Sequence, residues 1–319
     1  MRATRLLFAL VAAALFAGQT NAQDSDFPNR KVNLIVGFAP GGGIDTLARV
    51  VGQGLTDQFG YQIVIENRPG AASNIAARAV ANATPDGYTL LVTGNSLAIN
   101  QTYYKNPGYS IDELAPMAFA ARDAMTLAVK AESAARTLPE FVKARRGRPF
   151  SFGFGGSSAR IGGEYIFKVL LKAQATGVPF QSGAPAINAL LGGHVDIVTA
   201  PIAEIVPQVQ QGNLRALVVT GPQRSRSLPD VQTLQEAGLK GIEISGWNGF
   251  FAPAKVPQDV AAKLNADINA VVKSPSGDHR LRTLGYEPFT LPLADAPAFL
   301  KESIDGWARM IREAGIAVE

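Results

Sequence analysis

The chain has 319 residues, of which 47% are hydrophobic and 18% are charged, with no cysteine and only two histidines. This composition is typical of a globular protein that is long enough to form two lobes. The lack of cysteine excludes disulfides, iron–sulfur clusters and thiolate nucleophiles, and His194 and His279 alone cannot build a histidine-rich metal site. We therefore expect neither a metal nor a cofactor.

The formal net charge of +4 is too small to indicate a nucleic-acid partner. Arg2 and Arg5 lie in a segment that we expect to be removed, which lowers the charge of the remainder by two. The strongest basic run, residues 143–148, has no aromatic side chains interleaved for base stacking. We interpret that run as a solvated helix end and predict no nucleic-acid binding.

The first 22 residues have the pattern of a secretory signal peptide. A basic start is followed by an apolar run at residues 6–17 and by small residues at Thr20 and Ala22. Twelve residues of helix rise about 18 Å, which is too short to span a membrane. We predict cleavage after Ala22 and export of a soluble protein; an uncleaved anchor is the alternative.

Strands and helices alternate along the rest of the chain, which predicts βαβ units and parallel sheets. Strands are expected at residues 32–36, 63–65, 88–93, 124–129, 150–152, 178–180, 196–199, 214–219 and 249–252. Helices are expected at residues 44–55, 74–83, 138–144, 161–173, 184–191, 202–210, 259–272 and 296–314. A strand, a glycine loop and a helix occur at Gly41 and again at Gly155, so two similar α/β sheets should face each other.

The two glycine loops are candidate anion sites. Each loop leads from a strand into a helix, whose first N–H groups have no intrahelical partner and carry part of a positive charge. Glycine lets the backbone approach a ligand closely. A third candidate, Asn95 and Ser96 after Gly94, ends its own strand. A small anion such as a carboxylate suits such loops. The alternative is that each loop is only a structural turn.

Phosphate-binding motifs do not match. After Gly37 and Gly42, a P-loop needs lysine and Ser/Thr where Gly43 and Ile44 stand. The dinucleotide pattern G-x-G-x-x-G starts at Gly41 and again at Gly153, and both times it fails at its last position. These mismatches exclude a P-loop nucleoside triphosphatase and leave no dinucleotide fingerprint.

Hypotheses of catalysis have weaker support than the anion-binding hypothesis. Ser157 or Ser158 with His194 and Asp196 would make a triad, but the G-x-S-x-G nucleophile motif is missing. Asp45 is either a general base or an acidic residue that stabilises the first turn of its helix. Trp247 and Phe250 belong either to the core or to the cleft lining, and no residue pair requires catalysis.

The chain also resembles the Bug-type extracytoplasmic solute receptors, the substrate-binding components of tripartite tricarboxylate transporters. The matching segments cover nearly the whole predicted mature chain and follow the family order. They are FPNRKVNLIV (27–36), FAPGGGIDTLAR (38–49), VIENRPGA (64–71), PDGYTLL (85–91), AINALLGG (186–193), LRALVVT (214–220), RSRSLPDV (224–231), TLQEAG (233–238) and WNGFFAP (247–253).

The resemblance implies a two-lobed periplasmic binding protein of type II that closes on a carboxylate, with each lobe a mainly parallel sheet flanked by helices. Residues 1–22 would be the signal peptide, 23–122 with 248–319 lobe 1, and 123–247 lobe 2, with crossings near 117–130 and 240–252. It also implies no enzyme activity, a small carboxylate solute (a di- or tricarboxylate or an aromatic acid), membrane permease subunits as partners, and a monomer. The ligand-binding residues carried over are Phe38, Ala39, Pro40, Gly41, Gly42, Gly43, Asp45, Asn95, Ser96, Gly155, Gly156, Ser157, Ser158, Ala159 and Ala200.

The sequence departs from the family pattern near the second loop. Arg160 and Ile161 stand where the family usually has His-Leu, and the strand that usually ends in a Phe-Asp pair ends here at Ala200. Arg160 either adds positive charge near the cleft, which would suit a dianionic or aromatic acid, or points to solvent. Two rival functions stay open: a secreted hydrolase that uses Ser157 or Ser158, and a solute sensor that serves a signalling partner.

Overall fold

The structure, a computed structural model, describes residues 27–239 and 244–318, so the predicted signal peptide lies outside the described residues. The strands are β1 (Val32–Val36), β2 (Ile63–Asn67), β3 (Thr89–Gly94), β4 (Leu114–Lys130), β5 (Phe150–Gly155), β6 (Ala175–Phe180), β7 (Ile197–Pro201), β8 (Leu214–Val219), β9 (Ser245–Pro253) and β10 (Glu287–Pro288). The α-helices are α2 (Gly43–Phe59), α3 (Asn74–Ala81), α4 (Ser96–Tyr103), α5 (Leu138–Ala144), α6 (Ser157–Glu164), α7 (Gly183–Leu191), α8 (Ile202–Gln210), α9 (Gln258–Lys273), α10 (Pro275–Thr283) and α11 (Ala296–Glu313).

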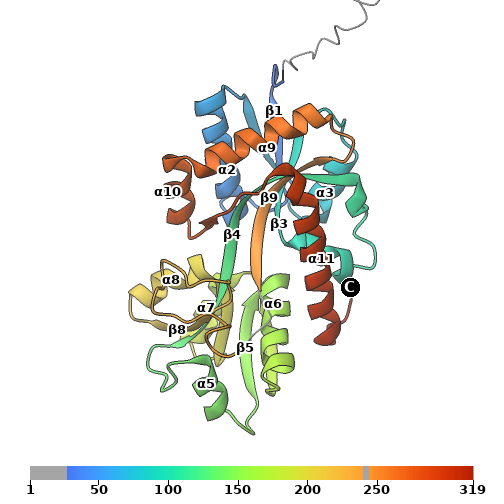
Figure 1. The fold of residues 1–319 in the computed structure, drawn as a ribbon. Coiled ribbons are helices and arrows are strands. Elements are labelled where there is room, and N and C mark those ends of the chain that lie inside the picture. The colour runs from blue at the N-terminus through green and yellow to red at the C-terminus, as the bar shows by residue number, and fades with distance from the viewer. Residues whose placement is uncertain (1–26, 240–243, 319) are drawn as a thin grey trace, which may run out of the picture.

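The strands form two sheets that share the long strand β4 (Figure 1). We call β2-β1-β3-β9-β4 the first sheet and β4-β7-β5-β6, with β8 on β4, the second sheet. β4 pairs with β9 through its first part and with β7 and β8 through its second part. The crossing segment predicted at residues 117–130 therefore lies within β4.

The two sheets repeat one arrangement. β1 lies parallel between β2 and β3, and β5 lies parallel between β6 and β7. Each central strand runs into one of the two glycine loops and then into a helix, α2 or α6. The α/β class predicted from the strand–helix alternation is confirmed, and the glycine loops lie at the carboxyl ends of the central strands, where such sheets bind ligands.

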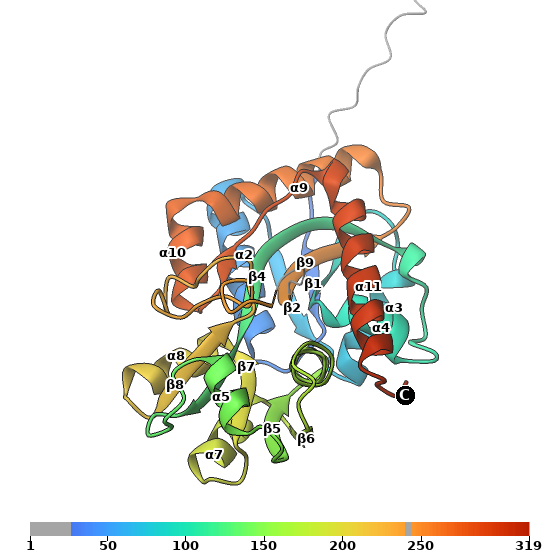
Figure 2. The same ribbon diagram turned by 60° about the horizontal axis from the view of Figure 1, so that its bottom comes forward.

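The helices cover both faces of each sheet. On the first sheet α2, α9 and α10 share one apolar core, whereas α3, α4 and α11 pack on the other face. On the second sheet α7 and α8 cover one face, and α6 covers the other. The core under α4 and α11 continues under α6, so this single core joins the two sheets on one side of the molecule, where α11 lies beside α4 (Figure 2).

Some elements differ from the expectation. The α4 helix was not predicted, because six of its eight residues are buried and its sequence lacks an amphipathic period. The helix expected at residues 161–173 instead begins at Ser157 and becomes π-helical at Tyr165–Leu170. Within the described ranges, no helix has the length and apolar character needed to cross a membrane.

Candidate functional site

Asp45 locks the first glycine loop in place. Its buried carboxylate accepts hydrogen bonds from the Gly41 N–H at 2.9 Å and from the Arg49 guanidinium at 2.9 and 3.0 Å. Asn67, at the end of β2, donates to Asp45 at 2.9 Å and to the Phe38 carbonyl at 3.0 Å. Gly41 has a φ of +77°, which glycine adopts without strain. The loop is therefore held in one conformation by side chains outside it.

These contacts assign Asp45 a structural part in the site. Burial acts to raise its pKa, but the Arg49, Gly41 and Asn67 donors outweigh burial and hold the pKa of this carboxyl below its ordinary value. The residues 39–43 beside it are exposed, and the first N–H groups of α2 there have no intrahelical partner. The loop thus presents backbone donors to the outside; direct contact of Asp45 with a ligand stays a prediction.

A set of unpaired polar groups lies next to this loop. Asn95 Nδ2, Ser96 Oγ and Asn248 Nδ2 are buried and have no hydrogen-bond partner among the described residues. Asn248, on β9, pairs with Gly94 in register, and a Cβ at Gly94 would lie 3.1 Å from Asn248 Oδ1 and 3.2 Å from Ile44 Cδ1. Buried polar atoms are normally satisfied, so these three groups form a place that suits a polar ligand.

The second glycine loop is held by backbone packing. A Cβ at Gly155 would overlap the backbone of Ser182 and Gly183, so only glycine fits there. Gly156, with a φ of +86°, precedes α6, whose start has no side-chain cap. Among the other residues predicted for this site, Ser157 and Ser158 are half-buried at the start of α6, whereas Ala159 is buried in the core.

A chain of close approaches connects the two loops. The Tyr286 hydroxyl occupies the space where a Cβ of Gly43 would lie, and Glu204 likewise fills the space beside Gly183. Glu204 and Asp123 both act electrostatically on Tyr286, raising its pKa together with burial, which is the main cause. Gly183 itself packs against the second loop, so Tyr286 at the first loop and Glu204 near the second loop act on each other electrostatically across the region between the loops.

Sequence reasoning missed four of the residues around this region. They are Asn67, Asp123, Glu204 and Tyr286. Asn67 and Asn248 lie in the family segments 64–71 and 247–253, where no role was assigned to them. Asp123, Glu204 and Tyr286 belong to no such segment, and the four missed residues come from four separate elements or turns. Only the tertiary structure brings them to the glycine loops.

Ala200 and Arg160 lie in contacts that the sequence did not predict. Ala200 is fully buried in the core with Ala186 and Leu190, and its contact with a ligand stays a prediction. The Arg160 guanidinium donates to the Tyr103 hydroxyl at 2.6 Å and lies 5.8 Å from the centre of that ring. Arg160 is half-buried and bridges α6 to α4, so it does not simply point to solvent.

The serine triad is not formed. Asp196 accepts hydrogen bonds from Arg145 at 2.7 Å and from the Ser151 N–H at 2.8 Å, at the amino end of β5. Ser157 follows the carboxyl end of β5, four strand residues or roughly 13 Å further on. His194 is exposed at the same end as Asp196. The geometry therefore does not support the hydrolase alternative. Within the described residues, no cluster of three or more His, Asp or Glu could hold a metal ion.

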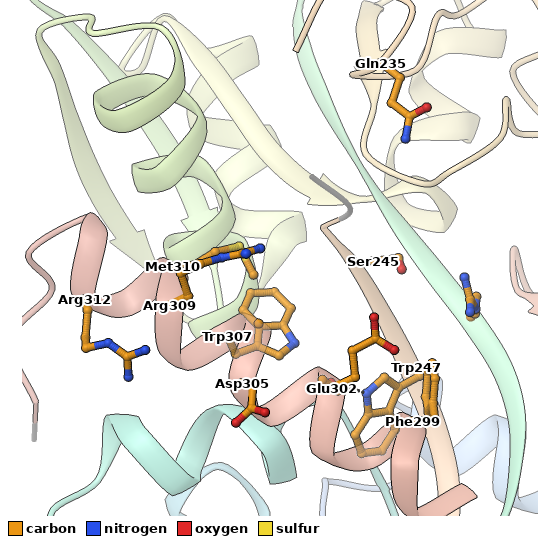
Figure 3. Close-up of a pocket in the computed structure, with 13 residues that line it drawn as sticks. Gln235, Ser245, Trp247, Phe299, Glu302, Asp305, Trp307, Arg309, Met310 and Arg312 are labelled. Carbon is orange, nitrogen blue, oxygen red and sulfur yellow. Dashed lines mark hydrogen bonds between the residues drawn. The ribbon is translucent and has the colours of Figure 1, made fainter. Parts of the chain in front are cut away.

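Trp247 and Phe250 belong to the core. Trp247 is buried against Phe119, with ring centres 5.1 Å apart, and its indole N–H donates to Ser303 Oγ at 2.8 Å. Trp247 and α11 also line a pocket of about 820 Å³, which contains none of the predicted loop residues (Figure 3). This pocket lies on the α11 face and is separate from the candidate site.

Residues 47–316 match a family model that is described as "Tripartite tricarboxylate transporter family receptor". The chain belongs to this receptor family. A relative from Pseudomonas sp. strain P51, the UPF0065 protein in the tcbD-tcbE intergenic region, is 32% identical over 321 residues that cover 97% of this chain and 94% of the relative. The Bug-type resemblance is thereby confirmed. The family consists of solute-binding receptors and not of enzymes.

Three solved structures of similar proteins share the fold. The periplasmic binding protein BugD is 29% identical, with a TM-score of 0.78, and the match covers 92% of this chain and all of BugD. Rpa4515 of R. palustris, solved with adipate, is 30% identical, with a TM-score of 0.81, and the match covers 92% of this chain and all of the Rpa4515 chain. MatC of Rhodopseudomonas palustris, solved with malate, is 31% identical with a TM-score of 0.74 over 89% of this chain and all of its own.

Proposed function

We propose that this receptor binds a small carboxylate between two lobes, residues 23–122 with 248–319 and residues 123–247, and closes on it. The observation that carries the proposal is that a glycine loop opens a helix after the central strand of each sheet, with Tyr286 packed on the first loop and Gly183 packed on the second. Helix N-termini stabilise anions through free N–H groups and the helix dipole. Asn95, Ser96 and Asn248 add unpaired polar groups at the same place.

The similar proteins support a carboxylate as the ligand. Adipate and malate, which Rpa4515 and MatC hold, are both carboxylates. We infer that after export and cleavage near Ala22 the monomeric receptor works in the periplasm and delivers its solute to membrane subunits of a tripartite transporter. Phe38–Asp45 and Gly155–Ala159 would grip one carboxylate from opposite sides.

A thermal-shift screen of mono-, di- and amino-carboxylates tests this function. A ligand that binds only the folded protein stabilises it by about 2.7 kcal/mol at 100 times its Kd. Asn248→Asp should weaken binding more than tenfold, because it places a negative charge beside the carboxylate. Asn106→Asp, in an exposed loop, carries the same change and should leave binding unaltered. No shift with any carboxylate would contradict the proposal.

A second experiment tests the link to transport. Deleting the gene should reduce uptake of the solute that the screen identifies, and restoring the gene should recover it. Unchanged uptake together with tight binding would instead indicate the sensor function.

A further inference from the structure

Two carboxyl groups lie near enough to Tyr286, whose hydroxyl packs on the first glycine loop, to act on it electrostatically. Asp123 extends from β4 over Gly246, and Glu204 extends from the first turn of α8 over Gly183. A Cβ at either glycine would collide with the facing carboxylate, so both acids occupy space that only glycine leaves open.

Neither acid has a positively charged partner among residues 27–239 and 244–318. No ion pair joins Asp123 or Glu204 to any side chain that the structure describes, and the buried Glu204 Oε2 has no hydrogen-bond partner there. Burial raises the pKa of Asp123 to about 6 and raises the pKa of Glu204 as well. By contrast, the other buried acid at the site, Asp45, is fully paired. Asp123 and Glu204 therefore keep free acceptor capacity.

Tyr286 connects these acids to the first loop. Its side chain is 8% exposed, and its hydroxyl forms no hydrogen bond within the described ranges. The hydroxyl lies over Gly43, at the start of α2. Since burial and the two carboxylates raise the pKa of Tyr286, the phenol stays protonated and can donate to a ligand. The Tyr286 hydroxyl thus connects Asp123 and Glu204 with the first glycine loop.

The proposed site thus combines hydrogen-bond donors at the glycine loops with negatively charged acceptors at Asp123 and Glu204. Helix N-termini and neutral amides suit one carboxylate, whereas a second carboxylate on the same ligand would meet Asp123 and Glu204 and be repelled. We propose that Asp123, Glu204 and Tyr286 select a ligand that carries an ammonium group in addition to its carboxylate. The inference rests on the proposed function of the same site and narrows its substrate class.

Titration calorimetry with matched probes tests this selection. Pentanoate, glutarate and 5-aminopentanoate each have five carbons and differ only in the group at the far end. Their four- and six-carbon homologues vary the distance between the two ends. The wild type should bind the best amino-carboxylate at least tenfold more tightly than the dicarboxylate of equal length. Asp123→Asn with Glu204→Gln should reduce that preference at least tenfold.

Glu302→Gln with Asp305→Asn is the matched control, because it removes two negative charges from α11 on the other face of the molecule and should leave the preference unaltered. Circular dichroism of each variant confirms that it folds. A wild type that prefers dicarboxylates, or a preference that survives the double substitution, would overturn the inference but not the proposed function. If no probe of any length binds the wild type, both fail together.

Discussion

The two glycine loops lie at equivalent places in the two sheets but are held in different ways. The first loop is fixed by hydrogen bonds to the charged carboxylate of Asp45, with help from Asn67 on the neighbouring strand. The second loop has no side-chain cap and relies on the fit of Gly155 against the backbone of Ser182 and Gly183. One loop is thus positioned by electrostatics and the other by shape.

The difference indicates an order of events in binding. Charge-assisted hydrogen bonds hold the first loop ready for a ligand, which lowers the entropy cost of binding there. The second loop depends on packing against Ser182 and Gly183 at the start of α7. We expect the ligand to meet the first loop before the lobes close, and the following experiments test that contrast.

The largest effect is expected from Gly155→Ala. The new methyl group would overlap backbone atoms, which cannot rotate away, so the free energy of unfolding should fall by about 3 kcal/mol. Urea unfolding followed by tryptophan fluorescence measures this change. Gly306→Ala, on α11 with open space around its Cβ position, should be neutral or slightly stabilising. Equal stability of both variants would show that the second loop does not depend on close packing.

Asp45→Ala tests the first loop. It leaves the Gly41 N–H, Arg49 and Asn67 without their acceptor and should cost about 2 kcal/mol, because Arg49 is half exposed and water replaces part of its interaction. Carboxylate affinity should fall at least tenfold as the loop loses its fixed shape. Since the folded pKa of Asp45 lies below its unfolded value of 3.8, its contribution is present above pH 4 and lost as the pH falls through the folded pKa. A stability difference that persists unchanged at low pH would contradict this role.

Asp123→Asn tests the acid that lies between the loops. The folded pKa of Asp123 is about 6 against an ordinary 3.8, so charging this group destabilises the fold as the pH rises from 4 through 6. The variant should gain about 1 kcal/mol at pH 7.5, after allowance for partial exposure, and nothing at pH 4. Melting temperatures of both proteins across this range measure the effect. A variant less stable than the wild type at pH 7.5 would show that Asp123 has a stabilising partner.

The smallest effect is expected from Tyr103→Phe. It removes the hydroxyl that accepts from Arg160 and so weakens the bridge between α6, which follows the second loop, and α4. Stability should fall by about 0.5 kcal/mol, and the unliganded protein should become more open in small-angle scattering. Tyr88→Phe removes a hydroxyl that is bonded to Asn29, where Tyr88 precedes β3 and Asn29 precedes β1, and should leave the radius of gyration unchanged. Identical scattering of both variants would show that the bridge does not hold the sheets together.

Local features of the fold could be predicted from the sequence because they depend on neighbouring residues. Gly60 ends α2 in the left-handed conformation, and the Thr137 side chain caps α5, which are roles typical of these residue types. Both glycine loops follow their strands and open helices, as the spacing predicted. Helix α4 escaped prediction because burial on nearly all sides removes the periodic pattern that marks a surface helix.

By itself the sequence determined the α/β class, the place of both loops and, through many family segments, the kind of receptor. The tertiary structure decided which side chains serve those loops. Asp45 proved to hold the loop, Arg160 to bridge two helices, and Ala200 to fill the core. Tyr286 and Glu204 reach the site from distant parts of the chain, and each fits because the residue it faces is glycine. Short stretches of sequence determine the backbone pattern, because it depends on neighbouring residues. The partner of a side chain depends on how distant stretches of the chain pack together.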